Sequence, residues 1–179
     1  SGENVMNGYW NDPDATSKTL INGWVHTGDI GEFDDEDYLK ITDRKKDILV
    51  NAGGDNISPT RVEAKLDIEP EIAQSMLYGD YKNYLVAVIV PDKDFAVNWA
   101  KENSKDQIFE SIVKDEDFIK TMKEIVNKVN KNLSVIEQVR KFILIDHEFT
   151  IENSMMTVSM KVRRFAVKDK YADQLEKLY

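Results

Sequence analysis

The chain has 179 residues and a formal net charge of −9, from 24 Lys and Arg against 33 Asp and Glu. This length allows one domain with a real core, or one domain and a piece of another. The acidic balance disfavours nucleic acid as a partner. The lack of cysteine excludes disulfides and thiolate metal sites, and it fits a reducing cytoplasm as the location.

The beginning of the chain has two explanations. It starts at Ser1 without an initiator Met or a basic and hydrophobic signal segment. No apolar run approaches the length of a membrane span. The start reflects either a processed N-terminus or a fragment of a longer protein, and the elements that follow favour the fragment.

A short helix is predicted near the start. Asp12 can cap it, Pro13 can occupy its first position, and it runs towards Leu20.

A hairpin is predicted next. Residues 24–33 and 38–41 alternate well enough for two strands, with the acidic residues 34–37 as the polar turn. This opening region has few large apolar residues and no partner sheet. We therefore expect it to pack against a segment upstream.

The sequence then predicts a short strand, a loop and a helix. Residues 47–50 indicate the strand and residues 52–56 a second hairpin loop. Ser58 and Pro59 open a helix that continues through Leu66 by the same combination of cap and proline.

The rest of the sequence indicates a compact α+β unit. Residues 73–78 and 84–90 are paired strands, and the second is nearly all apolar and therefore central. Residues 139–145 predict a third strand, and a helix closes the chain from about Val162.

Two helices between these strands carry apolar side chains that we assign to the core. The first covers 93–101, with Phe95 and Trp99 four residues apart. The second lays one apolar stripe on the sheet. This stripe consists of Phe118, Ile119, Met122, Ile125, Val126, Val129 and Leu133.

The region 23–63 carries the strongest chemical signal. Two loops rich in Gly and Asp suit a polar ligand that has hydroxyls and phosphate, because glycine lets the backbone approach closely. Asp29 can accept from a diol, and Arg44 is a rigid donor with several N–H groups.

The order of these motifs resembles a known family. Residues 27–29 (Thr-Gly-Asp), 43–46 (Asp-Arg-Lys-Lys) and 52–57 (Ala-Gly-Gly-Asp-Asn-Ile) are similar to the C-terminal part of adenylate-forming acyl-CoA synthetases. That superfamily also holds luciferases, aryl-CoA ligases and the adenylation domains of peptide synthetases. The long-chain fatty acyl-CoA ligase branch fits best, on residues 8–13 and 24–29. Any single motif would be weak, but their joint order is specific.

The resemblance covers essentially the whole chain and implies its organisation. Residues 1–43 would be the C-terminal edge of the large AMP-binding domain. Residues 44–179 would be a small mobile lid domain of the α+β class, with a three-stranded sheet flanked by helices and a β-hairpin.

The resemblance implies that Asp29 and Arg44 bind the ribose hydroxyls of ATP. An ionised carboxylate accepts only, which suits a diol. An exposed turn aspartate is the plain alternative for Asp29. An ion pair with Asp43 or Asp47 is the alternative for Arg44.

Lys46 matches the hinge about which the lid swings between two poses, since a hinge needs a backbone free of buried anchors. An ordinary surface lysine is its alternative. Gly53 and Gly54 would border the tunnel for the CoA pantetheine, with a plain tight turn as the alternative.

Lys161 matches the catalytic lysine of the family's Thr-Pro-Thr-x-Lys-x-x-Arg segment. An ammonium group there would offset the negative charge that grows when a carboxylate attacks the α-phosphate. The alternative is a helix with a solvated basic face. The sequence departs from the pattern: Val158 and Ser159 replace Pro and Thr, and Met155 stands where Glu is common. We expect the loss of Pro to loosen the loop.

The two histidines do not indicate a metal site. His26 and His147 lie far apart, without Cys or suitably spaced carboxylates, so we predict no zinc site. We expect His26 to pack or cap within its loop.

The implied function is an ATP-dependent long-chain fatty acid–CoA ligase that forms AMP. Its substrates would be a fatty acid, ATP and CoA, with Mg²⁺ held by ligands outside this sequence. It would need the large N-terminal domain, so the chain alone is expected to be inactive. The resemblance also allows a peripheral membrane association of the full-length enzyme. Two alternatives remain: another adenylating ligase such as an aryl-CoA ligase, or a non-catalytic binding or regulatory module.

Overall fold

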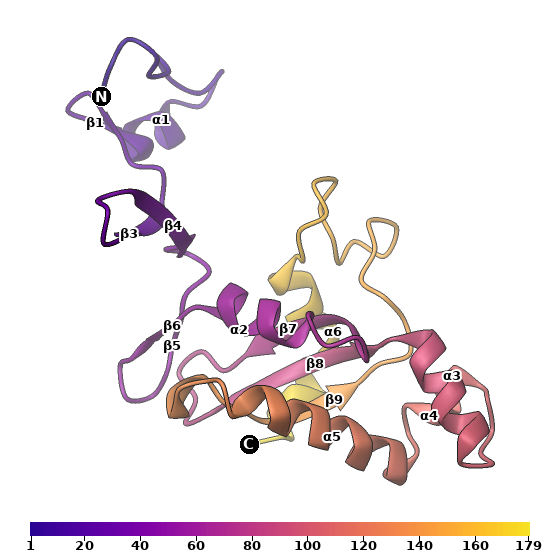
Figure 1. Ribbon diagram of the computed structural model, residues 1–179. Coiled ribbons are helices and arrows are strands. Elements are labelled where there is room, and N and C mark those ends of the chain that lie inside the picture. Colours follow the sequence, from indigo (N-terminus) through magenta and orange to yellow (C-terminus); the bar gives the residue numbers. More distant parts are fainter. The chain divides into compact units, whose positions relative to one another are not determined.

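The computed structural model describes residues 1–179, apart from the side chain of Asp43. The chain divides into two compact units, 1–48 and 49–179 (Figure 1). Each unit has its own hydrogen-bonded elements.

The first unit contains one helix and two small hairpins. The Asp12 carboxylate accepts a hydrogen bond from the Ala15 N–H at 2.9 Å, which confirms the predicted helix cap. Its elements are α1 (Pro13–Thr19), β1 (Leu20–Ile21), β2 (Trp24–Val25), β3 (Asp29–Phe33) and β4 (Leu39–Arg44).

The prediction of one strand over 24–33 is wrong. β2 pairs with β1, and a separate strand, β3, begins at Asp29 and pairs with β4. Gly28 between them has φ +75°, a left-handed conformation that breaks an extended strand. The polar turn 34–37 is confirmed: the Asp34 carboxylate accepts from the backbone of Glu36 and Tyr38.

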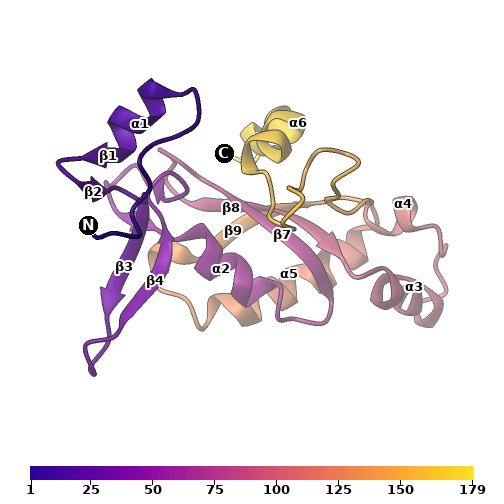
Figure 2. The ribbon, with the colours of Figure 1, turned by 90° about the horizontal axis from the view of Figure 1, so that it is seen from above.

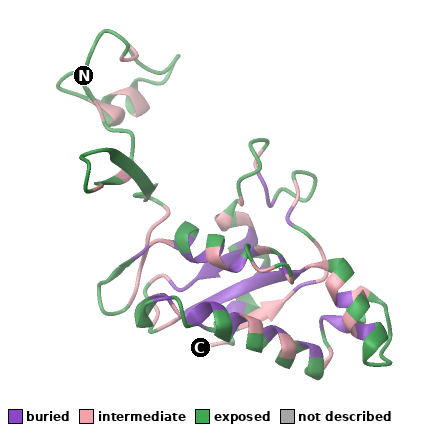
Figure 3. Ribbon diagram, viewed as in Figure 1, coloured by how far each residue is buried: buried purple, intermediate pink, exposed green. Residues whose placement is uncertain are grey.

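The first unit has little interior of its own. Among its described side chains none is fully buried, and large apolar ones such as Trp24, Phe33 and Leu39 are exposed (Figure 3). The prediction that an upstream segment covers this surface is consistent with that exposure and stays a prediction.

The second unit is the predicted α+β fold. Helix α2 begins at Pro59 with Ser58 as its cap, as predicted. The elements are β5 (Leu49–Val50), β6 (Asn56–Ile57), α2 (Pro59–Leu66), β7 (Ile72–Tyr78), β8 (Leu85–Pro91), α3 (Lys93–Glu102), α4 (Phe109–Ile112), α5 (Glu116–Asn130), the short 3₁₀ turn η1 (Val135–Glu137), β9 (Val139–Leu144) and α6 (Arg164–Glu176).

The central sheet has the order β7-β8-β9. β8 lies antiparallel to β7, with Ser75 opposite Ile89, and parallel to β9, with Ile89 opposite Leu144. Every residue of β8 is buried, as its continuous apolar sequence predicts for a central strand.

The side chains on the two faces of β8 belong to two different hydrophobic clusters. Leu85, Ala87 and Ile89 belong to the cluster shared with α2, α3 and α5. Val86 and Val88 belong to the cluster shared with α6. The alternation of side chains along a strand thus puts α5 and α6 on opposite faces of the sheet, as Figures 1 and 2 show.

Helix α5 lays most of the predicted stripe into the first cluster. Phe118, Met122 and Val126 are buried, whereas Ile119 is 38% exposed and does not belong to the stripe. A step of one residue turns a helix by about 100°, which carries position 119 off the face that position 118 shares with the sheet. Leu133 is buried but lies beyond the end of the helix.

Phe95 and Trp99 pack against this stripe as predicted. They are half-buried, and their ring centroids lie 6.1 and 5.0 Å from that of Phe118. Helix α4 and turn η1 were not predicted, because elements of four and three residues are too short to show a helical period. Along the described chain, no helix combines the length and the apolar character that crossing a membrane requires.

The core packing gives a first prediction. Phe118→Ala should destabilise the fold by about 3–5 kcal/mol, because a fully buried ring leaves a cavity. Ile119→Ala, on the same turn but partly exposed, should cost less than about 1 kcal/mol. Urea unfolding of both variants measures the difference. Equal losses would contradict the assigned orientation of α5.

Candidate functional site

Asp29 and Arg44 lie opposite each other across the β3–β4 hairpin. The Arg44 Nε donates to Asp29 Oδ1 at 3.2 Å, although the residues are 15 positions apart. Both side chains keep contact with solvent, so the pair contributes at most about 1 kcal/mol to stability. A carboxylate has about four acceptor sites, so Asp29 can hold Arg44 and a hydroxyl-bearing ligand together.

A cavity of about 390 Å³ opens beside this pair. Its lining combines cationic side chains with a glycine backbone, which suits a ligand that carries hydroxyls and negative charge. It is lined by Thr27, Gly28, Arg44, Lys45 and Lys46. The Lys45 N–H donates to the Gly28 carbonyl oxygen at 2.8 Å and ties the two sides of the cavity together.

Lys46 lies in the turn that follows β4. The N–H groups of Asp47 and Ile48 both donate to the Arg44 carbonyl oxygen, at 2.9 and 3.2 Å. Lys46 itself is exposed, two residues before the end of the first unit. Its role as a hinge, and the division of the chain at residues 43 and 44, stay predictions.

Gly53 and Gly54 form the tip of the β5–β6 hairpin. The Asn51 Oδ1 accepts from the N–H groups of Gly53 and Asp55, both at 2.9 Å, and the Asn51 amide donates to the Asp55 carboxylate at 3.0 Å. Gly54 has φ +87°, which glycine adopts without steric cost. The loop is therefore a defined turn with open space over Gly54.

The turn between β7 and β8 supports this hairpin. The Val50 N–H donates to the Asp80 carboxylate at 3.0 Å, and the Tyr81 N–H donates to the Val50 carbonyl oxygen at 2.7 Å. The Ala52 N–H donates to the Lys82 carbonyl oxygen at 3.0 Å. Three bonds thus hold the glycine hairpin against the central sheet.

Lys161 closes a tight turn ahead of α6. The Thr157 N–H donates to the Lys161 carbonyl oxygen at 2.8 Å, and the Lys161 N–H donates to the Thr157 Oγ1 at 3.1 Å. The Lys161 side chain is exposed, and so are its apolar neighbours Val158 and Met160. The structure therefore places this lysine at the closing end of a hydrogen-bonded turn, with its side chain exposed.

The departures from the family pattern have structural outcomes. Met155 is buried in the cluster beneath α6, so an apolar residue suits this position. The Ser159 hydroxyl lies 3.0 Å from that of Thr157. Although Val158 replaces a proline, two hydrogen bonds close the turn, and the expected loosening of the loop stays a prediction.

The structure thus brings some of the predicted residues together. Asp29 and Arg44 are in contact, and Lys46 lines the same cavity as Arg44. The glycine pair 53–54 and Lys161 lie in two separate loops of the second unit. The functional role of each stays a prediction.

An ion pair that the sequence did not reveal lies next to the Lys161 turn. The Arg164 guanidinium donates two hydrogen bonds to the buried carboxylate of Glu63 on α2. One sequence signal could have indicated this pair. Glu63 falls between Val62 and Leu66 on the buried face of α2, so the apolar helical pattern places an acid where a partner is needed.

The two histidines have different surroundings. His26 is exposed rather than packed, while His147 Nδ1 lies 2.7 Å from the Asp146 carboxylate. His147 Nε2 lies 2.6 Å from the Tyr171 hydroxyl, and burial raises the pKa of Tyr171 to about 12. Within the described residues, no group of three or more His, Asp or Glu side chains is arranged to hold a metal ion.

Comparisons with known proteins identify relatives for nearly the whole chain. Residues 46–179 match the family described as the AMP-binding enzyme C-terminal domain. The chain is 36% identical over 177 residues to the long-chain-fatty-acid–CoA ligase FadD15 of Mycobacterium tuberculosis, covering 98% of this chain and 30% of that protein. It is 34% identical over 182 residues to the human long-chain-fatty-acid–CoA ligase 1, covering 99% and 26%. The chain thus spans less than a third of the length of these relatives.

Solved structures share the fold. The adenylation domain of a carboxylate reductase from Mycobacterium chelonae superposes with a TM-score of 0.83 at 27% identity, covering 97% of this chain and 26% of that one. The adenylation and carrier didomain of a carboxylic acid reductase from Segniliparus rugosus, in complex with AMP, gives 0.79 at 26% identity, covering 100% and 24%.

The glycine hairpin gives a second prediction. Gly54→Ala should destabilise the second unit by about 1 kcal/mol, because a side chain at φ +87° is strained while no neighbouring atom obstructs it. Gly53→Ala should change stability by less than about 0.5 kcal/mol, since its backbone is outside the left-handed region and the nearest atom, Asn51 Oδ1 at 3.3 Å, can adjust. Urea unfolding distinguishes the two variants. A larger loss for Gly53→Ala would contradict the turn geometry.

Proposed function

Because the chain belongs to the AMP-binding enzyme C-terminal domain family of the adenylate-forming superfamily, we propose that it is the C-terminal part of a long-chain fatty acid–CoA ligase. The observation that supports nucleotide binding is the Asp29–Arg44 pair beside a cationic cavity. The fatty acid branch rests on the names of relatives that are 34–36% identical.

In the proposed first step, a carboxylate oxygen of the fatty acid attacks the α-phosphorus of ATP. A new O–P bond forms, the bond to the bridging oxygen breaks, and pyrophosphate leaves with the electron pair. Asp29 and Arg44 hold the ribose hydroxyls. Lys161 offsets the negative charge that develops at phosphorus, and this role is electrostatic stabilisation rather than proton transfer.

In the proposed second step, the sulfur of CoA attacks the acyl carbonyl carbon. A C–S bond forms, the C–O bond to AMP breaks, AMP leaves with the electron pair, and the thiol proton is released. The second unit turns about Lys46 between the steps. This withdraws Lys161 and offers the open surface over Gly54 to the thin pantetheine arm.

The remaining parts of the site belong, in this proposal, to the part of the enzyme that this sequence does not include. These are the Mg²⁺ ligands, the phosphate-binding loop and the acyl pocket, which the large N-terminal domain would supply. We also propose a cytoplasmic location, with peripheral attachment of the complete enzyme to membranes.

A second candidate is an adenylating enzyme with another acid or another acceptor. The solved adenylation domains of carboxylate reductases share the fold at TM-scores of 0.79 and 0.83, which favours keeping this alternative. Release of AMP from acyl-AMP that depends on CoA would support the ligase. Release that is indifferent to CoA would support another acceptor, whereas CoA-dependent release with a preference for a non-fatty acyl-AMP would support another acid.

The division of labour gives a third prediction. In the complete enzyme, Lys161→Ala should lower acyl-AMP formation by about 100-fold or more, because a stabilising charge is lost from the transition state. The same variant should keep the reaction of supplied acyl-AMP with CoA within a few fold. ATP–pyrophosphate exchange and thioester formation measure the two steps separately.

Lys168→Ala is the matched control, since Lys168 is an exposed lysine on α6, seven positions after Lys161. It should leave both steps unchanged. A Lys161 variant that lost both steps equally would contradict the proposed roles.

The incomplete site gives a fourth prediction. The purified 179-residue chain should not catalyse ATP–pyrophosphate exchange with any fatty acid, because its sequence contains no glycine-rich Ser/Thr phosphate loop. Radiolabelled pyrophosphate provides the assay, and measurable exchange would overturn the expectation.

A further inference from the structure

The buried contact between α2 and α6 carries an inference about how Lys161 is held. Glu63 is only 9% exposed, and its carboxylate forms an ion pair with Arg164. Its carboxylate accepts hydrogen bonds from two nitrogens of the Arg164 guanidinium and from the Leu77 N–H, the last at 2.6 Å. One side chain thus joins a helix, a strand and a second helix.

The bond to Leu77 fixes Glu63 itself. Strand β7 is an edge strand of the sheet, and Leu77 pairs with Ala87 on its other side. The Leu77 N–H is buried and needs an acceptor, because an unpaired buried donor costs free energy. Glu63 supplies that acceptor, so this hydrogen bond holds its carboxylate against the sheet independently of the contact with Arg164.

The N-terminus of α6 depends on this carboxylate. Its cap residue, Arg163, makes no side-chain capping hydrogen bond, and the first helical residue, Arg164, is also basic. Positive charge at this end opposes the helix dipole. The carboxylate of Glu63 offsets that charge and fixes the direction in which α6 begins.

Arg164 lies only three positions after Lys161. The Arg163 N–H donates to the Met155 carbonyl oxygen at 2.7 Å, and the Thr157 N–H donates to that of Lys161 at 2.8 Å. The base of the turn is therefore tied to the start of α6, while the Lys161 side chain is exposed. The position of Lys161 is therefore set by the 157–161 turn and by the start of α6.

Stability alone does not explain a buried ion pair here. The cost of removing two charges from water often matches the gain from their attraction, and apolar replacements can be neutral. A bidentate Arg–carboxylate pair does, however, fix one geometry. The pair is therefore suited to setting an orientation.

We propose that Glu63 is a positioning residue for adenylation: through Arg164 it sets the N-terminus of α6 and thereby the turn that presents Lys161. This inference rests on the proposed role of Lys161. It assigns Glu63 no contact with any substrate.

The test uses the complete enzyme with Glu63→Gln, which removes the charge and keeps an oxygen for the Leu77 N–H. We expect the rate of acyl-AMP formation to fall about 10- to 100-fold, because small misplacements of a catalytic group cost this much. The KM for ATP and the reaction of supplied acyl-AMP with CoA should stay within about threefold, since Asp29 and Gly54 are untouched.

A double-mutant cycle with Arg164→Gln shows whether Glu63 acts through Arg164. The double variant removes both charges, which avoids leaving one buried charge unpaired if a single variant folds poorly. We expect it to be no slower than the slower single variant. Additive losses would overturn the proposal.

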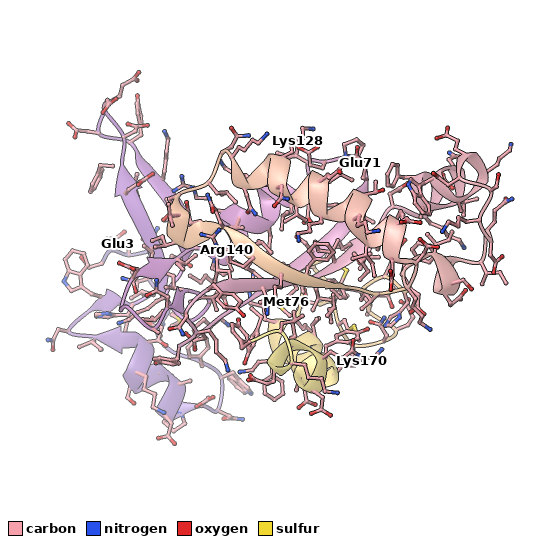
Figure 4. All side chains as sticks on the ribbon, turned by 90° about the horizontal axis from the view of Figure 1, so that it is seen from below. Glu3, Glu71, Met76, Lys128, Arg140 and Lys170 are labelled. Carbon is pink, nitrogen blue, oxygen red and sulfur yellow. The ribbon has the colours of Figure 1, made fainter. Side chains whose placement is uncertain are left out.

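Glu69→Gln is the matched control. Glu69 forms an ion pair with Lys128 of α5 at 2.6 Å. Figure 4 shows Lys128 on the face of the sheet opposite to α6, which carries Lys170, so this ion pair does not involve α6. This variant should keep adenylation within about twofold.

Lys161→Ala in the same assay distinguishes a failure of the proposed function from a failure of the positioning role of Glu63. If that variant adenylates normally, the proposed function fails. If Lys161→Ala is inactive and Glu63→Gln is normal, or if Glu63→Gln lowers both steps equally, only the positioning role fails.

Discussion

The burial of β8 on both faces is the constraint on which the second unit depends. A strand with seven buried residues needs a partner strand on each side and a covering layer on each face. β7 and β9 provide the pairing, and α5 and α6 belong to the clusters on the two faces. The loops that carry Gly53–Gly54 and Lys161 are attached to this rigid frame, which allows both to be exposed and still defined.

The first unit follows a different logic. Its elements are short, none of its described side chains is fully buried, and many of its large apolar residues are exposed. Local hydrogen bonds rather than a core define its shape, such as the cap at Asp12 and the turn at Asp34. The chain spans less than a third of the length of its relatives, and the assignment of this unit to the edge of a larger domain stays a prediction.

Function and packing meet at the start of α6. The basic residues there, Lys161, Arg163 and Arg164, do not form one solvated face. Arg164 is committed to the buried Glu63, whereas Lys161 three residues earlier is exposed. One local sequence thus supplies a buried ion-pair partner and, three positions earlier, an exposed lysine.

The sequence by itself determined most of the longer helices, the central strands and the identity of the motifs. Cap-and-proline signals placed α1 and α2, and continuous apolar runs placed the central strands, because these features act over a few neighbouring residues. The separate strand at Asp29, the exposure of Ile119 and the Glu63–Arg164 pair were decided only by the tertiary structure. Each depends on a backbone conformation at Gly28, a helix orientation or a contact between residues 101 positions apart. The apolar pattern of α2 indicates a buried acid at Glu63 but does not identify its partner.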